Sequence, residues 1–122
     1  MSKKILIADD EPDIVRMLVS RLSAANYDVE VAYDGYSVIK KARETAPDLI
    51  LMDYMMPAGN GVTTYDNLQK LGKLSLIPVI FITAAPTEEL KQKVLSMGAV
   101  DLVPKPFDPV ELMEKIKKVI GD

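Results

Sequence analysis

The sequence predicts a three-layer α/β domain, in which helices cover both faces of a parallel β-sheet. Five short apolar runs alternate with five longer segments whose apolar residues recur at helical spacing. Three of the runs are almost continuously apolar, which is typical of strands that are covered on both faces. Strict alternation of strand and helix favours right-handed crossovers, which place helices on both sides of one sheet.

The predicted strands differ in how their apolar residues are arranged. DVEVA and AVDLV alternate or are interrupted by charged residues, so we expect these two at the edges of the sheet. The five runs, in chain order, are KILIA at 4–8, DVEVA at 28–32, LILM at 49–52, VIFIT at 79–83 and AVDLV at 99–103.

Each intervening segment carries its apolar residues on one helical face, which predicts five amphipathic helices. The five faces are Ile14, Leu18, Leu22 and Ala25; Val38, Ala42 and Ala46; Val62, Tyr65, Leu68 and Leu71; Leu90, Val94 and Met97; and Leu112, Met113, Ile116, Val119 and Ile120.

Residues typical of helix ends agree with this assignment. Gly35 and Gly61 lie where the second and third helices should start, and Gly98 should close the fourth. Thr87 is a predicted N-cap followed by two glutamates, and Asp108 precedes a proline at the favoured first helical position.

Size and composition further limit the number of domains and the possible classes of function. With 122 residues, of which 48% are hydrophobic, the chain is large enough for one compact core, and we expect a single domain spanning residues 1–122. The net charge is −3, with no block of like charge, which disfavours a direct nucleic-acid reader. No apolar run is long enough for a signal peptide or a membrane span, so we expect a cytoplasmic protein.

Cysteine and histidine are both absent from the sequence. Their absence excludes disulfides, thiolate nucleophiles, imidazole bases and soft zinc sites. Any metal ion must therefore be held by oxygen atoms.

Polar residues follow the predicted strands at the points where the strands end. The carboxyl ends of parallel strands meet at one edge of a sheet, and ligands of open α/β sheets bind at that edge. The candidate site residues are Asp9, Asp10 and Glu11 after the first strand, Asp53 after the third, Thr83 at the end of the fourth and Lys105 just after the fifth.

The adjacent carboxylates of Asp9 and Asp10 repel each other, and no basic residue is near them in sequence. A hard divalent cation such as Mg²⁺, which prefers oxygen ligands, would relieve the repulsion between these two residues and Asp53. Asp53 then has the chemistry of a nucleophile that forms an aspartyl phosphate. Lys105 could pair with the phosphate, and the Thr83 hydroxyl could donate a hydrogen bond to it.

Each of these residues also has an ordinary structural explanation. An acidic residue at a strand end is often a turn former or an N-cap, Thr83 suits a strand, and Lys105 suits the surface. The joint occurrence of these residue types at four strand ends favours the functional interpretation.

With these residues in place, the chain resembles the receiver domain of two-component response regulators over essentially its whole length. The matching motifs are ADD at 8–10, LILMDYMMP at 49–57 followed by Gly61, ITA at 82–84 and KPF at 105–107. The resemblance implies a flavodoxin-like fold with strand order 2-1-3-4-5.

The resemblance also implies roles for individual residues. Asp9, Asp10 and Asp53 would bind Mg²⁺ together with the backbone carbonyl of Met55, and Asp53 would accept phosphate from a phosphohistidine. Thr83 and Lys105 would contact the phosphoryl oxygens, and the Lys105–Pro106 peptide bond would be cis, which is inexpensive only before proline.

Because the chain has no histidine, the phosphate donor must be another molecule. The resemblance implies a sensor histidine kinase or a histidine phosphotransfer protein, with acetyl phosphate as a possible substitute. The domain would catalyse only its own phosphorylation and dephosphorylation, so it would not be an enzyme in the usual sense. Its output would be binding or phosphorylation of a downstream protein, through the surface of the fourth helix, fifth strand and fifth helix.

Three departures from the family pattern concern this output. Leu102 stands where the family commonly has Tyr or Phe; we expect it to pack against the sheet, with signalling through shifts near the fourth helix. Ala58-Gly59-Asn60 contains an extra glycine and should form a more pliable loop. Met55 and Ala85 are apolar where the family often positions the hydrolytic water, which predicts slow self-dephosphorylation.

Three other functions fit the pattern less well. A pseudo-receiver that binds proteins without phosphorylation would not need the full acidic set. A phosphohydrolase of the haloacid dehalogenase kind has an Asp-x-Asp motif and usually a cap, whereas here the aspartates are adjacent. A flavodoxin needs a phosphate cradle after the first strand, where ADDEPD would repel phosphate unless a metal intervened.

Overall fold

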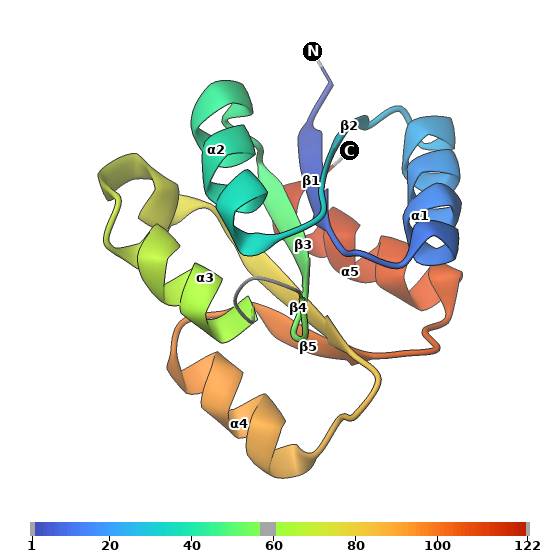
Figure 1. Cartoon of the computed structure of the whole chain (residues 1–122). Helices are drawn as coiled ribbons and strands as arrows, with labels where there is room; N and C mark the ends of the chain where they lie inside the picture. The colour runs from blue at the N-terminus through green and yellow to red at the C-terminus, as the bar shows by residue number, and fades with distance from the viewer. Residues whose placement is uncertain (1, 57–60, 122) are drawn as a thin grey trace.

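The structure is a computed structural model that describes residues 2–56 and 61–121. Within these residues, strands and helices alternate as predicted, and one short 3₁₀ helix is added (Figure 1). The elements are β1 (Lys4–Ala8), α1 (Pro12–Ala24), β2 (Asp28–Ala32), α2 (Gly35–Thr45), β3 (Leu49–Asp53), α3 (Gly61–Gln69), η1 (Gly72–Leu76), β4 (Val79–Thr83), α4 (Glu88–Ser96), β5 (Asp101–Pro104) and α5 (Pro109–Ile120).

The sheet is parallel throughout and has the strand order β2-β1-β3-β4-β5, which confirms the predicted topology and the two predicted edge strands. Helices α1 and α5 cover one face, and α2, α3 and α4 cover the other (Figure 1). In the strand register, Asp53 lies opposite Ile82, one residue before Thr83. The carboxyl ends of β1, β3, β4 and β5 therefore meet at one edge.

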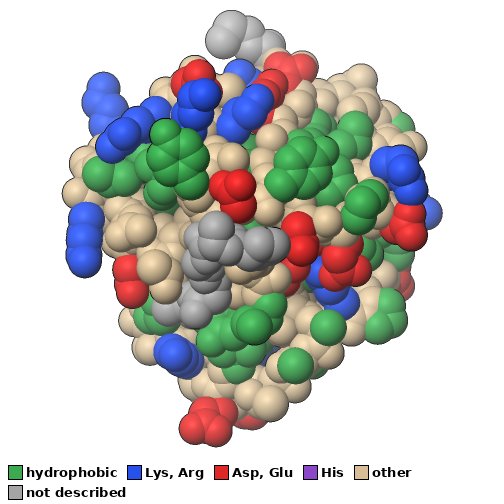
Figure 2. All heavy atoms as spheres, in the orientation of Figure 1, with side chains coloured by type: hydrophobic (Ala, Val, Ile, Leu, Met, Phe, Trp, Pro, Cys, Tyr) green, Lys and Arg blue, Asp and Glu red, His purple; other side chains and the backbone are tan. Residues whose placement is uncertain are grey.

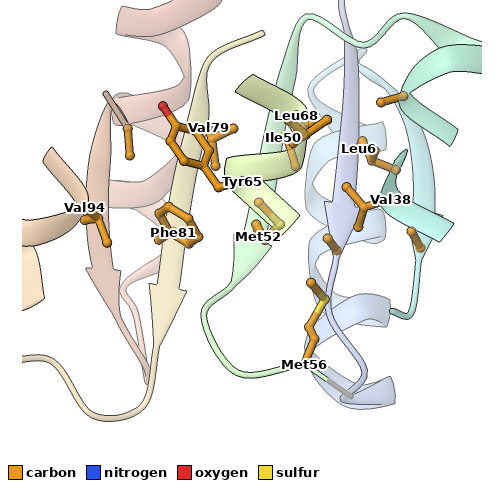
Figure 3. Close-up of a cluster of buried hydrophobic side chains, with 14 of the residues drawn as sticks. Leu6, Val38, Ile50, Met52, Met56, Tyr65, Leu68, Val79, Phe81 and Val94 are labelled. Atoms are coloured by element: carbon orange, nitrogen blue, oxygen red, sulfur yellow. The ribbon is translucent and has the colours of Figure 1, made fainter. Parts of the chain in front are cut away.

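Side chains that alternate along the central strands form two separate apolar cores. Ile5 and Ile7 pack with α1 and α5, whereas Leu6 points to the opposite face, which α2, α3 and α4 cover (Figure 3). Phe81 is fully buried on this second face and packs edge-to-face against Tyr65, with 5.6 Å between the ring centroids. Every residue of β3 and β4 is buried, because helices cover both of their faces.

Several predicted helix ends are confirmed. The Thr87 hydroxyl accepts a hydrogen bond from the Leu90 amide at 3.0 Å, and the Asp108 carboxylate accepts one from the Val110 amide at 2.8 Å. Both interactions satisfy amides that the first helical turn leaves unpaired. Gly98 follows α4 with φ at +110°, and a Cβ there would lie 2.9 Å from the Tyr65 hydroxyl oxygen.

Some predicted boundaries are wrong by one or two residues. The fifth strand begins at Asp101 rather than at Ala99, because the Ala99 amide still bonds to the Val94 carbonyl at the end of α4. The third strand extends to Asp53, and α2 ends before Ala46, which adopts the left-handed conformation. The loop at Ala58-Gly59-Asn60 lies outside the described residues.

None of the helices in residues 2–56 and 61–121 combines the length and the apolar character needed to cross a lipid bilayer.

An ion pair fastens α5 to the edge strand β5. Lys115 on α5 donates to the Asp101 carboxylate at 2.5 Å, and the Leu102 amide donates to the same side chain. Burial raises the pKa of Asp101, but the hydrogen bonds from Lys115 and Leu102 and the lysine charge outweigh burial and lower the pKa below its usual value.

Replacing Asp101 with asparagine should therefore lower the free energy of unfolding by about 1 kcal/mol at pH 7. Because the folded-state pKa is depressed, the carboxylate stabilises the fold above its unfolded pKa, and the difference should vanish as pH falls through the folded value. Urea titrations of the native chain and of the variant, at pH 7 and at low pH, measure the difference in their free energies of unfolding. A difference that grows on acidification would contradict this explanation.

Candidate functional site

The polar residues predicted at the strand ends surround one cavity. Its volume is about 300 Å³, and it opens at the carboxyl edge of the sheet. On the side of the molecule drawn in Figure 2, acidic side chains lie next to a basic side chain near the middle of the view. The lining residues are Asp10, Glu11, Asp53, Met55, Thr83, Ala84, Ala85 and Lys105.

The backbone at the end of β1 fixes the first acidic side chains. The Asp9 amide continues the sheet ladder by donating to the Ala32 carbonyl at 3.2 Å, and the Asp9 side chain is almost completely buried. Its Oδ1 accepts a hydrogen bond from the Glu11 amide at 2.9 Å, which turns the chain into α1. Asp10, between them, is exposed and faces the cavity.

Asp53 and Thr83 are held in a similar way at the ends of β3 and β4. Asp53 Oδ1 accepts a hydrogen bond from the Met55 amide at 3.1 Å, and Thr83 Oγ1 accepts one from the Ala85 amide at 3.1 Å. Both side chains are buried, whereas the Met55 side chain is 67% exposed at the rim. Asp53 Oδ2 remains directed toward Lys105.

Lys105 joins the acidic residues together. Its Nζ lies 2.7 Å from Glu11 Oε1, 3.0 Å from Asp9 Oδ2 and 3.3 Å from Asp53 Oδ2. Its amide donates to the Thr83 carbonyl at 2.7 Å, and the peptide bond to Pro106 is cis, as predicted. A positive charge from the chain itself thus offsets part of the repulsion between the aspartates.

The contact between Lys105 and Glu11 was not predicted. The sequence predicts the correct edge of the sheet for Glu11 but predicts no partner for its side chain. Only its acidic character and its position next to Asp10 pointed to it. The 94 residues that separate it from Lys105 are brought together by the sheet, and the Glu11 side chain is 56% exposed.

Burial and neighbouring charges shift the pKa values of the central pair. Burial raises the pKa of the Asp53 carboxyl and the charge of Asp9 raises it further, so that the Met55 amide and Lys105 lower it only in part. Burial lowers the pKa of Lys105, but the hydrogen bond to Glu11, the close ion pair with Asp9 and the charges of Asp9 and Asp53 outweigh burial and raise it. Lys105 therefore stays protonated at neutral pH.

The aspartates fit a divalent cation. Asp9, Asp10 and Asp53 each offer a carboxylate oxygen, and these three oxygens lie within 4.8 Å of one another. Among the described residues, the buried Asp9 Oδ2 has no hydrogen bond of good geometry, only its ion pair with Lys105. An oxygen-only set of this kind suits a hard ion such as Mg²⁺.

Residues 5–117 match the family described as the response regulator receiver domain. The chain belongs to this family. It is 39% identical to the alkaline phosphatase synthesis transcriptional regulatory protein PhoP of Bacillus subtilis, over 98% of the chain and 49% of that regulator. The chain spans about half the length of the curated relatives it matches.

Solved receiver structures share the whole fold. A putative response regulator from Chloroflexus aurantiacus superposes with a TM-score of 0.92 at 26% identity, covering 100% of both chains. The receiver domain of sensor histidine kinase PA1611 from Pseudomonas aeruginosa superposes with a TM-score of 0.89 at 25% identity, also covering 100% of both chains. In that protein a magnesium ion is coordinated in the active site cleft.

Three residues that depart from the family pattern lie in the described part of the chain, and the structure shows where their side chains lie. Leu102 is 6% exposed and packs in the same apolar core as Val94 of α4, as expected for a packing residue. Met55 and Ala85 are both exposed and line the cavity with apolar groups.

Replacing Lys105 with methionine should remove the cation that lies within 3.3 Å of three carboxylates. The side chains of Lys105, Asp9 and Asp53 are all less than a tenth exposed, so we expect the free energy of unfolding to fall by about 3 kcal/mol at pH 7 in EDTA. Urea titration measures this loss, and added Mg²⁺ should restore part of it.

Lys118→Met is the matched control, because Lys118 lies exposed on α5, away from the cavity. Its effect should stay within about 0.5 kcal/mol. Equal losses in the two variants would show that Lys105 does not hold the acidic residues together.

Proposed function

We propose that this chain is the phosphoacceptor domain of a two-component system, in which Asp53 receives a phosphoryl group from a phosphohistidine. The observation that carries the proposal is the buried Asp53 carboxylate, which lies at a cavity beside two further aspartates and Lys105. Membership of the receiver family supports it.

In the proposed reaction, a carboxylate oxygen of Asp53 attacks the phosphorus atom of the donor. A P–O bond forms as the P–N bond of the phosphohistidine breaks, and the electron pair of that bond stays with the imidazole nitrogen. Positioning of the reactants and neutralisation of their charge supply most of the catalysis. The chain would therefore catalyse only the modification and hydrolysis of its own side chain.

We propose that Mg²⁺ is held by Asp9, Asp10 and Asp53 and by the backbone carbonyl of Met55. A bound Mg²⁺ would neutralise negative charge on the carboxylates and on the incoming phosphoryl oxygens. The oxygen-only donor set and the buried Asp9 Oδ2 support this assignment.

Thr83 and Lys105 would hold the phosphoryl group after transfer. The Thr83 hydroxyl oxygen accepts from the Ala85 amide, so its own proton can be donated to a phosphoryl oxygen. Lys105 already contacts Asp53 Oδ2 and needs only a small movement to pair with an oxygen attached to that side chain.

The partners follow from the same chemistry. The phosphate donor would be a sensor histidine kinase or a histidine phosphotransfer protein, since this sequence has no histidine. We propose a cytoplasmic domain spanning residues 1–122 that signals by protein binding through α4, β5 and α5. Leu102 has no ring to rotate, so the signal would pass through shifts of the backbone and of α4.

Asp53→Asn should abolish phosphorylation of the chain, because the amide is not a competent nucleophile. Acetyl phosphate with Mg²⁺ is the reagent, and intact-protein mass spectrometry detects the added phosphoryl group; EDTA should also abolish it. Asp66→Asn is the control, since Asp66 is exposed on α3 away from the cavity, and it should label normally. Acid-labile phosphate persisting on the Asp53 variant would refute the acceptor assignment.

The same experiment separates the proposal from a pseudo-receiver that acts without phosphorylation. Absence of any Mg²⁺-dependent labelling by acetyl phosphate or by a histidine kinase would favour the pseudo-receiver. The retained acidic residues and Lys105 make that function the less favoured one.

The phosphorylated chain should lose its phosphate slowly. The side chains of Met55 and Ala85 line the cavity and offer no strong hydrogen-bonding group to orient an attacking water molecule. Loss of the phosphoryl group, followed by mass spectrometry after removal of the donor, should be slow in the native chain and faster in Met55→Asn. A native lifetime as short as that of fast chemotaxis regulators would contradict this explanation.

A further inference from the structure

A second and larger cavity lies between α2 and α3. Its volume is about 750 Å³, and none of its described lining residues lines the acidic cavity. It is lined by Gly35, Tyr36, Ile39, Lys40, Arg43, Glu44, Thr63, Thr64, Asn67, Lys70 and Leu71. We refer to it as the α2–α3 groove.

Part of the α2–α3 groove is apolar although it faces solvent. The Tyr36 side chain is 78% exposed at one end, and Ile39 and Leu71 are only half-buried. A single exposed apolar side chain needs no explanation, but three that share one hollow form a surface that a ligand could cover.

The charges along the α2–α3 groove are mainly positive. Lys40, Arg43 and Lys70 line it and are exposed, whereas Glu44 is its one acidic lining residue. None of these three cations forms an ion pair within the part of the chain that the structure describes. In Figure 2, basic side chains gather over the side of the molecule formed by α2 and α3.

This local charge contrasts with the charge of the whole chain, which is −3. A long polyanion would be repelled by most of the surface, whereas a ligand confined to the groove would meet an excess of positive charge. The charge pattern thus selects a compact acidic ligand with an apolar side.

We propose that the α2–α3 groove binds an acidic amphipathic helix of a partner protein. A groove between two helices accepts a third helix whose apolar residues recur at i, i+3, i+4 and i+7. Helix α2 has 11 residues and is therefore about 16 Å long, which matches three turns of a partner helix. Tyr36, Ile39 and Leu71 contact the apolar stripe, and Lys40, Arg43 and Lys70 pair with flanking carboxylates.

The groove is independent of the phosphoryl chemistry proposed above. Among residues 2–56 and 61–121 it shares no lining residue with the acidic cavity, and it lies on the opposite face of the sheet from α1 and α5 (Figure 1). A bound helix would leave Asp53 accessible, so the inference stands whether or not Asp53 is phosphorylated.

The test uses a designed peptide and the intact ¹⁵N-labelled chain. The probe is a hydrocarbon-stapled helix of about 16 residues, with leucines on one face and glutamates elsewhere; the staple is needed because short free helices are marginal in water. Titration followed by NMR should give saturable amide shifts concentrated in α2, α3 and Lys70–Leu71. Shifts centred on another surface, or no saturable binding, would overturn the proposal.

Two control peptides define the chemistry of the groove. A peptide with lysine in place of every glutamate, and one with the leucines spread around the helix, should both bind at least about tenfold more weakly. Equal binding of either peptide, or equally tight binding of heparin at the same residues, would show that the groove does not recognise an acidic amphipathic helix.

Variants of the chain complete the test. The double variant Lys40→Glu, Lys70→Glu should weaken binding about tenfold, because two favourable pairs become repulsive. Tyr36→Ala should also weaken binding; because Tyr36 is exposed, the variant should keep the native fold, which a thermal melt checks. The matched control Lys93→Glu, Lys118→Glu changes the net charge equally at exposed sites outside the groove and should leave binding unchanged. Equal weakening in both double variants would overturn the proposal.

Discussion

The mutual repulsion of carboxylates at the edge of the sheet is the constraint on which this site depends. Asp9 and Asp53 are buried there, beside the exposed Asp10, and Lys105 is placed within 3.3 Å of two of them and of Glu11. Water cannot screen these charges well, so the chain must supply positive charge of its own. The fold brings that charge from a loop more than 90 residues away from Asp9 and Glu11.

The parallel sheet makes this arrangement possible. Its buried central strands all end at one edge, and hydrogen bonds from the Glu11, Met55 and Ala85 amides fix the side chains that follow. Two apolar cores, one on each face, hold the strands in register; Figure 3 shows the core beneath α2, α3 and α4. The polar residues of the site therefore lie at the carboxyl edge of the sheet, and the apolar residues that stabilise the fold lie along the strands, as in other open α/β sheets.

Most of the fold followed from the sequence because the strands and helices have strong, distinct periodicities. The start of β5 did not, since Ala99 is apolar in either setting and only its hydrogen bond to Val94 assigns it to the end of α4. The 3₁₀ helix at Gly72–Leu76 has no periodic signal of its own. The strand ends identified the site, but the pairing of Glu11 with Lys105 depends on side-chain reach, which spacing does not encode.

Gly98 is constrained twice. Its backbone occupies a region that residues with a side chain rarely adopt, and the Tyr65 hydroxyl fills the space where a Cβ would lie. Tyr65 in turn packs against Phe81 in the core. Replacing Tyr65 with phenylalanine would make room for a Cβ at position 98. The positive φ angle at position 98 would remain, so this change would not make a larger residue acceptable at that position. The turn between α4 and β5 is thereby packed against Tyr65 of α3, and through Tyr65 it is linked to Phe81 at the centre of the sheet.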